Sequence, residues 1–103
     1  MNVVVVVHFE PVPGREAELE QALIDSLPAV HEEPGCLLYA LHRDADGRIV
    51  LIENWESEAE LDVHGAGPAV AALDARIEGL TASPPHVARL SPLPAGDRQR
   101  GAL

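Results

Sequence analysis

The sequence predicts an α+β fold with the element order β-α-β-β-α-β. Four short runs of alternating or β-branched apolar residues predict strands, and stretches with helical spacing lie between the first and second runs and between the third and fourth. A turn sequence with glycine separates the second and third runs, which is typical of a hairpin. This order is that of the ferredoxin-like split β-α-β arrangement, in which helices cover one face of an antiparallel sheet.

The first predicted strand is the run VVVVVHFE at residues 3–10. Successive side chains of a strand point to opposite faces. One face carries Val3, Val5, Val7 and Phe9, and the other carries Val4, Val6, His8 and Glu10. Both faces are largely apolar, so we expect this strand to be covered on both sides.

A turn at residues 11–14 precedes a helix predicted from Arg15 to about Glu32. Its apolar stripe consists of Leu19, Leu23, Leu27 and Val30. Several glutamates lie in its first turns, where the helix dipole favours negative charge. Pro28 predicts a kink or an irregular turn, and the sequence EEPG at 32–35 ends the helix.

The second and third strands are predicted at residues 36–43 and 48–55, joined by the turn DADG at 44–47. Ser57 and Glu60 fit a capping box, so a helix is expected to start directly after the third strand.

That short helix carries Leu61 and His64 and ends at the glycines of 65–67. Pro68 suits the first position of a further helix. The stripe of this further helix consists of Val70, Leu73, Ile77 and Leu80. A last strand is predicted at 86–91.

Residues 1–92 are expected to form one domain, followed at 93–103 by a tail without periodicity. A sheet with helices on one face leaves its other face open. The open face is predicted to carry Val4, Val6, Val50 and Ile52. A bare apolar face marks an interface, so we predict a homodimer that forms through this face of the sheet.

Composition argues against several classes of partner. The formal net charge is −10, and the seven arginines are spread along the chain, which disfavours binding to nucleic acid or to an anionic membrane. The longest apolar run, residues 3–7, is far shorter than the roughly 20 residues of a membrane helix. No signal-peptide pattern is visible, so the expected location is cytoplasmic.

The sequence contains no familiar cofactor or metal motif. Cys36 is the only cysteine, which excludes an intramolecular disulfide, and we expect it to be a small buried side chain. No two of the five histidines are three or four residues apart, so a helical pair of metal ligands is excluded. The sequence therefore predicts neither a metal site nor a cofactor site.

Four residues are candidates for chemistry. Glu53 and Trp55 project from the same face of the third strand. Glu53 either reaches water and pairs with an arginine or acts as an acid or base in a pocket, and Trp55 either fills the core or forms a pocket wall. His64 is either a surface residue at the helix end or a pocket base. Tyr39 and His42 lie on opposite faces of the second strand, and we favour Tyr39 for the pocket.

An apolar lining of that pocket is expected from Val5, Val7, Phe9 and Leu51. Such a lining favours an aromatic ligand over a charged sugar phosphate.

Two segments resemble the antibiotic biosynthesis monooxygenase domain family, in particular its small quinol-monooxygenase-like branch. The segment EPGCLLYALHRD begins at residue 33, and VLIENWESEAELDVHGAGPAV begins at residue 50. The opening FEPVPGREAELEQAL also matches as strand, turn and first helix, and the resemblance spans about residues 3–92.

The resemblance implies a dimeric α+β barrel with a pocket between the helices and sheet of each monomer. It implies cofactor-free oxidation by O₂ of an electron-rich aromatic, such as a quinol, an anthrone or a polyphenol. Glu53, His64 or Tyr39 would serve as base or hydrogen-bond partner, and Trp55 as a stacking wall. Family members also include isomerases and proteins without demonstrated activity. The alternatives are therefore an isomerase or lyase acting on a small keto compound and a non-catalytic ligand-binding or accessory dimer.

The chain departs from two branches of that family. Well-studied members of the polyketide branch use an Asn, a Trp, a Tyr and an Arg, and only the tryptophan has a clear counterpart, Trp55. Haem-degrading relatives carry a histidine in the later helix, and residues 67–80 contain none, so the resemblance does not imply haem.

Overall fold

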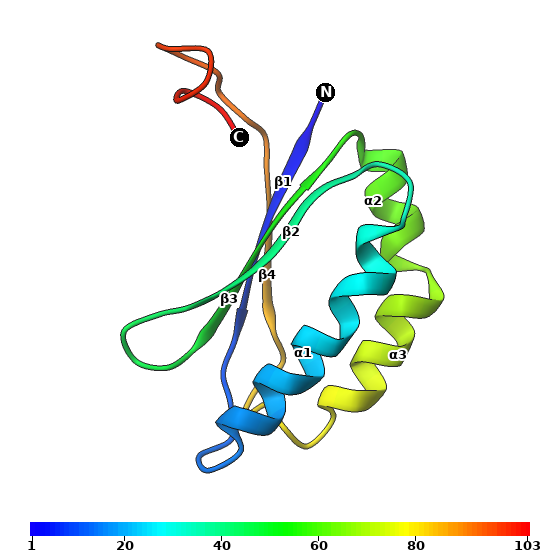
Figure 1. Cartoon of the computed structure of the whole chain (residues 1–103), viewed down its shortest axis with the longest axis vertical. Coiled ribbons are helices and arrows are strands. Elements are labelled where there is room, and N and C mark those ends of the chain that lie inside the picture. Colours follow the sequence, from blue (N-terminus) through cyan, green and yellow to red (C-terminus); the bar gives the residue numbers. More distant parts are fainter.

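A four-stranded antiparallel sheet with three helices on one face makes up the fold of the computed structural model, which describes residues 1–103 (Figure 1). The elements are β1 (Val3–Phe9), α1 (Glu16–His31), β2 (Cys36–Arg43), β3 (Ile49–Trp55), α2 (Glu58–Gly65), α3 (Pro68–Ile77) and β4 (His86–Leu90). The predicted ferredoxin-like order is therefore confirmed, with the second helical segment divided into α2 and α3.

The strands lie in the order β2-β3-β1-β4, and each neighbouring pair is antiparallel. Each predicted strand and helix begins and ends within two residues of its observed bounds, except that Leu80 lies beyond the end of α3. None of the three helices is long and apolar enough to cross a lipid bilayer.

Two sequence signals at helix ends behave differently in the structure. Ser57 caps α2 as predicted, because its side chain accepts a hydrogen bond from the backbone N–H of Glu60 (3.3 Å). Pro28, in contrast, does not stop α1, which continues to His31. Pro28 is exposed and the preceding turn carries the exposed Ile24, so the carbonyl that loses its N–H partner lies on the solvent side.

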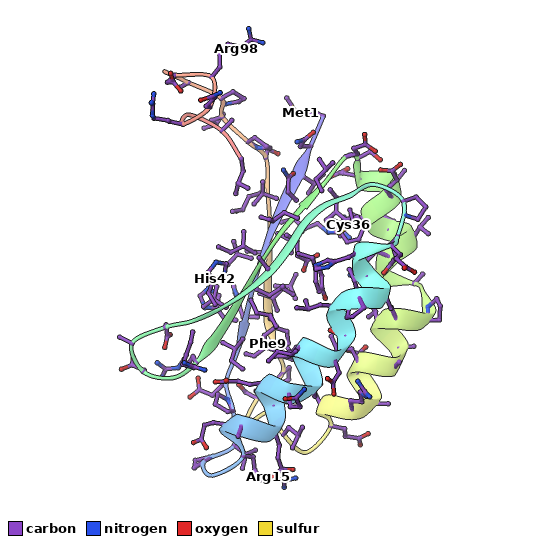
Figure 2. The ribbon with its side chains drawn as sticks, in the orientation of Figure 1. Met1, Phe9, Arg15, Cys36, His42 and Arg98 are labelled. Carbon is purple, nitrogen blue, oxygen red and sulfur yellow. The ribbon has the colours of Figure 1, made fainter.

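The core lies between the covered face of the sheet and the helices. From the sheet it contains Val3, Val5, Val7, Phe9, Tyr39, Ile49, Leu51 and Trp55. From the helical layer it contains Leu19, Ala22, Leu23, Val30, Leu61, Leu73, Ile77 and Leu80. Figure 2 shows Phe9 directed toward α1. Each large apolar side chain buried in this way stabilises the fold by about 1.5–3 kcal/mol.

The opposite face of the sheet carries no helix (Figure 1). The strand register places Val6 opposite Ile52 and His8 opposite Val50 on this face. The expected apolar set of Val4, Val6, Val50 and Ile52 therefore does share one face, as the two-residue period predicted.

The EPG turn between α1 and β2 packs tightly against the start of α2. Gly35 has a φ of +83°, and its carbonyl accepts a hydrogen bond from the backbone N–H of Glu56 (2.9 Å). A Cβ at this position would overlap the side chain of Glu60. Only glycine therefore allows the turn this close to α2, and this approach brings Glu33 toward the helix that carries His64.

We expect Gly35→Ala to lower the free energy of unfolding more than Gly47→Ala. Both glycines have a left-handed φ, whose cost for an L-residue is about 1–2 kcal/mol. Only Gly35 meets a neighbour, and such overpacking costs about 1–3 kcal/mol more. Urea denaturation of both variants measures the difference. Equal destabilisation would show that α2 does not require the close turn.

Candidate functional site

A cavity of about 310 Å³ lies between the covered face of the sheet and helices α2 and α3. The sequence-predicted residues that line it are Tyr39, Glu53, His64, Val5, Val7, Phe9 and Leu51. The further lining residues are Leu61, Gly65, Val70, Leu73, Asp74, Ile77, Pro85, Val87 and Arg89. A mostly apolar hollow that contains a few convergent polar groups is the usual form of a small-molecule site.

One cross-strand row supplies several of the polar groups. Tyr39 pairs with Glu53, Glu53 pairs with Val5, and Val5 pairs with Arg89 in the strand register. Directly opposed residues of antiparallel strands project from the same face. The row therefore crosses the whole sheet on its covered side, from the edge strand β2 to the edge strand β4.

Trp55 lies behind the cavity lining. Its side chain is fully buried, and its indole Nε1–H donates a hydrogen bond to Oε1 of Glu53 (2.8 Å). Its ring stacks at a tilt on His64, with the ring centroids 4.5 Å apart. Trp55 therefore does not form the stacking wall that was expected. The end of β3 lies beneath α2, and Trp55 fills the core there. Trp55 thus supports two lining residues and does not itself face the cavity.

Glu53 is a buried carboxyl, with 4% of its surface exposed. Its one hydrogen-bond partner is Trp55, and no arginine forms an ion pair with it. Burial raises the pKa of Glu53, and the Trp55 hydrogen bond and the positive charges of His64 and Arg89 offset this only in part. Of the two alternatives for Glu53, the structure therefore supports the pocket residue and not the water-exposed partner of an arginine.

His64 pairs with a carboxylate that the sequence analysis did not single out. Its Nδ1 lies 3.0 Å from Oε1 and 3.2 Å from Oε2 of Glu33. A carboxylate can only accept hydrogen bonds, so Nδ1 is the donor, and in the neutral ring Nε2 is then the acceptor. His64 itself is buried and is not a surface residue at a helix end. In the sequence, the one feature that marked Glu33 was its place in the EPG turn. Because 31 residues separate Glu33 from His64, the sequence gave no indication that the two side chains are in contact.

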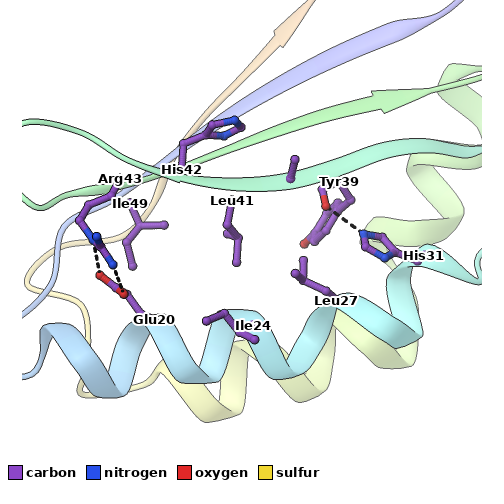
Figure 3. Close-up of a pocket in the computed structure, with 10 residues that line it drawn as sticks. Glu20, Ile24, Leu27, His31, Tyr39, Leu41, His42, Arg43 and Ile49 are labelled. Atoms are coloured by element: carbon purple, nitrogen blue, oxygen red, sulfur yellow. Dashed lines mark hydrogen bonds and ion pairs between the residues drawn. The ribbon is translucent and has the colours of Figure 1, made fainter.

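Tyr39 is also buried, and its ring packs edge-on against His64 with the centroids 5.6 Å apart. Burial raises the pKa of Tyr39, and the negative charges of Glu53 and Glu33 raise it further. Its hydroxyl therefore stays protonated and acts as a hydrogen-bond donor, not as a base. His42, one register step beyond Leu41, projects away from α1 on the open face (Figure 3).

A second hollow, a groove of about 590 Å³, runs between α1 and the edge strand β2 (Figure 3). At one end Arg43 makes two hydrogen bonds to Glu20 (2.8 and 2.6 Å), and at the other His31 contacts the backbone oxygen of Tyr39 (2.9 Å). Between these ends the groove is apolar. Its ionic groups are already paired and exposed, so the cavity under α2 and α3 is the better candidate for chemistry.

No group of three or more His, Cys, Asp and Glu side chains is arranged to hold a metal ion. Cys36 is only partly buried, not fully buried as expected, and burial raises the pKa of its thiol. A raised pKa disfavours the nucleophilic thiolate, so Cys36 is not a candidate for covalent chemistry.

Comparison with known proteins gives a concordant result. A family model described as antibiotic biosynthesis monooxygenase matches residues 2–76. Rv0793 of Mycobacterium tuberculosis, described as a putative monooxygenase, is 33% identical over 88% of this chain and 91% of its own length. The solved structure of Rv0793 superimposes with a TM-score of 0.86, covering 94% of this chain and 100% of that one at 31% identity.

A Caulobacter crescentus structure, described as a putative antibiotic biosynthesis monooxygenase, gives a TM-score of 0.83 at 28% identity. The superposition covers 89% of this chain and 90% of the Caulobacter crescentus chain.

We expect Glu53→Gln to stabilise the protein at pH 8 and to change its stability little at pH 4. An amide can still accept the Trp55 hydrogen bond but cannot ionise. Because the folded pKa of Glu53 is raised above 4.5, its stabilising contribution is complete below pH 4.5 and is lost as the pH rises through the folded value. Thermal unfolding at both pH values tests this, with about 4–8 °C expected per kcal/mol. Equal shifts at both pH values would contradict the raised pKa of Glu53.

Proposed function

Because the chain belongs to the antibiotic biosynthesis monooxygenase family, we propose that it is a cofactor-independent monooxygenase that oxidises a small electron-rich aromatic with O₂. The observation that carries this proposal is the Glu33–His64 pair, which presents a histidine base to the same cavity as the hydroxyl of Tyr39 and the carboxyl of Glu53. Quinols, anthrones and polyphenols are the substrate class.

The first step is removal of a proton from the substrate. Nε2 of His64 accepts the proton of a phenol or of an activated methylene, and the carboxylate of Glu33 stabilises the imidazolium that forms. Such a fixed carboxylate also holds the ring in the tautomer that a base requires. The anion that results is rich enough in electrons to react with O₂.

The second requirement is stabilisation of the negative charge on the substrate oxygen. The carboxyl of Glu53 accepts from Trp55 through Oε1, so in its protonated form, which burial favours, its O–H is available to the ligand. The hydroxyl of Tyr39 is a second donor. Donors held in place before the reaction stabilise a developing oxyanion most effectively in an apolar cavity.

The substrate supplies the electrons for the oxygenation. When the methylene of an anthrone becomes a carbonyl, one oxygen atom of O₂ enters the product and the other leaves as water, with the two methylene hydrogens. The apolar walls formed by Val5, Val7, Phe9 and Leu51 limit the access of bulk water to the reactive anion.

A second candidate is an isomerase or lyase acting on a small keto compound. Enolisation needs a base for the carbon acid and a donor for the carbonyl oxygen, and His64 and Glu53 fit these two roles. Oxygen consumption separates the two reactions, because only the monooxygenase requires O₂. A purely ligand-binding protein would bind such compounds without turnover.

We also propose that two chains associate through the open face of the sheet. Val6, Val50 and Ile52 are half-buried on this face in the isolated chain, and no helix covers them. A contiguous apolar surface on a sheet gains most from burial against a second copy of itself.

We expect His64→Gln to lower kcat for oxygen uptake by about 10²–10⁴-fold, the usual contribution of a general base. Glu33→Gln should lower kcat less, because its amide oxygen can still accept the hydrogen bond from Nδ1 of His64 but no longer provides the charge that faces the imidazolium. The matched control is Glu32→Gln, which removes an exposed neighbouring carboxylate. An oxygen electrode with a panel of quinols and anthrones provides the measurement. No uptake by the wild type across this panel would overturn the monooxygenase proposal.

For the assembly, light scattering on the eluting protein should give twice the chain mass of 11.0 kDa at micromolar concentration. Val6→Arg should give a monomer, because it places a charge within the proposed interface. Val63→Arg, at an exposed site on α2, should leave the dimer intact. A monomeric wild type, or a dimer that tolerates both Val6→Arg and Val50→Arg, would refute this arrangement.

A further inference from the structure

We propose that the cavity takes an aromatic monoanion whose acidic group, a carboxylate or a phenolate, pairs with Arg89. This inference rests on the proposed function, because it specifies the substrate of the same cavity. Arg89 is the only arginine among the lining residues, and the chain has no lysine. It extends from the edge strand β4, next to β1 (Figure 1).

The cross-strand row places Arg89 at a useful distance from the reactive groups. Glu53 and Arg89 flank Val5 in this row, so their backbones are two strand spacings apart, roughly 9–10 Å. The side chain of Val5 provides an apolar floor between them. An aromatic ring that lies on Val5 would direct one oxygen substituent toward Glu53 and an opposite substituent toward Arg89.

The guanidinium of Arg89 is only weakly engaged in the free protein. Its Nη2 makes one hydrogen bond, to Oδ1 of Asp62 (3.0 Å), and the two side chains are 47% and 66% exposed. Such an exposed pair contributes at most about 1 kcal/mol. Arg15 and Arg43, in contrast, each make two bonds to a single carboxylate. The fork of Arg89 is therefore available for a bidentate bond with a planar anion.

The charge balance of the lining sets the charge of the ligand. Asp74 is the one lining carboxylate outside the row. Glu53 is buried, and burial raises its pKa, which disfavours a negative charge there. A ligand with a single negative charge can pair with Arg89. A second negative charge would find no other arginine or lysine in the lining and would meet Asp74 and a chain of net charge −10. This charge distribution disfavours dianions such as phosphate monoesters.

The test compares 4-hydroxybenzoate with 4-hydroxybenzamide, which have nearly the same shape and differ in charge. Isothermal titration calorimetry of the wild type should give at least ten-fold tighter binding of the acid. Arg89→Gln should remove this preference, and Arg89→Lys should restore part of it. Asp62→Asn should tighten the binding of the acid, because it removes the competing carboxylate.

The matched control is Arg76→Gln, on α3 outside the lining, where the arginine lies 3.9 Å from Asp25. It should leave the preference unchanged, and circular dichroism of every variant checks the fold. Equal affinity for the acid and the amide, no binding of either at millimolar concentration, or a preference that survives Arg89→Gln would each overturn the role of Arg89. Oxygen uptake is measured separately, so loss of the acid preference in a protein that still oxidises quinols overturns only this inference.

Discussion

The hydrogen bond from the indole N–H of Trp55 to the carboxyl of Glu53 connects the core of the protein to its cavity. A buried indole needs an acceptor, and a carboxyl on the covered face of a sheet needs a donor or a proton. Each side chain meets the need of the other at the end of β3. The rotamer of Glu53 is fixed by this bond, and His64 stacks on the same indole. The positions of both polar groups therefore follow from the packing of one tryptophan.

The connection between α1 and β2 provides the second constraint. Gly35 allows the turn to approach α2, and the side chain of Glu60 occupies the space that a Cβ would need. Glu33, two residues earlier, then reaches Nδ1 of His64. The glycine that the backbone requires in this turn thus also influences how the His64 ring is oriented. The orientation of the proposed general base and the stability of the turn are consequently linked.

The alternation of side chains along β1 and β3 gives the two faces of the sheet different roles. The covered face bears the row that ends at Arg89, and the open face bears the apolar set proposed to pair with a second chain. A change of register by one residue would exchange these faces. The cavity chemistry and the proposed assembly therefore depend on the same strand register, although no residue takes part in both.

Local patterns determined the elements and the faces of this protein. The two-residue period placed Glu53 with Trp55 and separated Tyr39 from His42, and the capping box located the start of α2, because each of these features depends on residues close in the sequence. Tertiary structure alone decided that Trp55 lies behind the cavity, that Glu33 meets His64, and that Arg89 joins the row of Glu53. These contacts join segments distant in the chain, so they depend on strand order and helix packing, which no short-range period encodes.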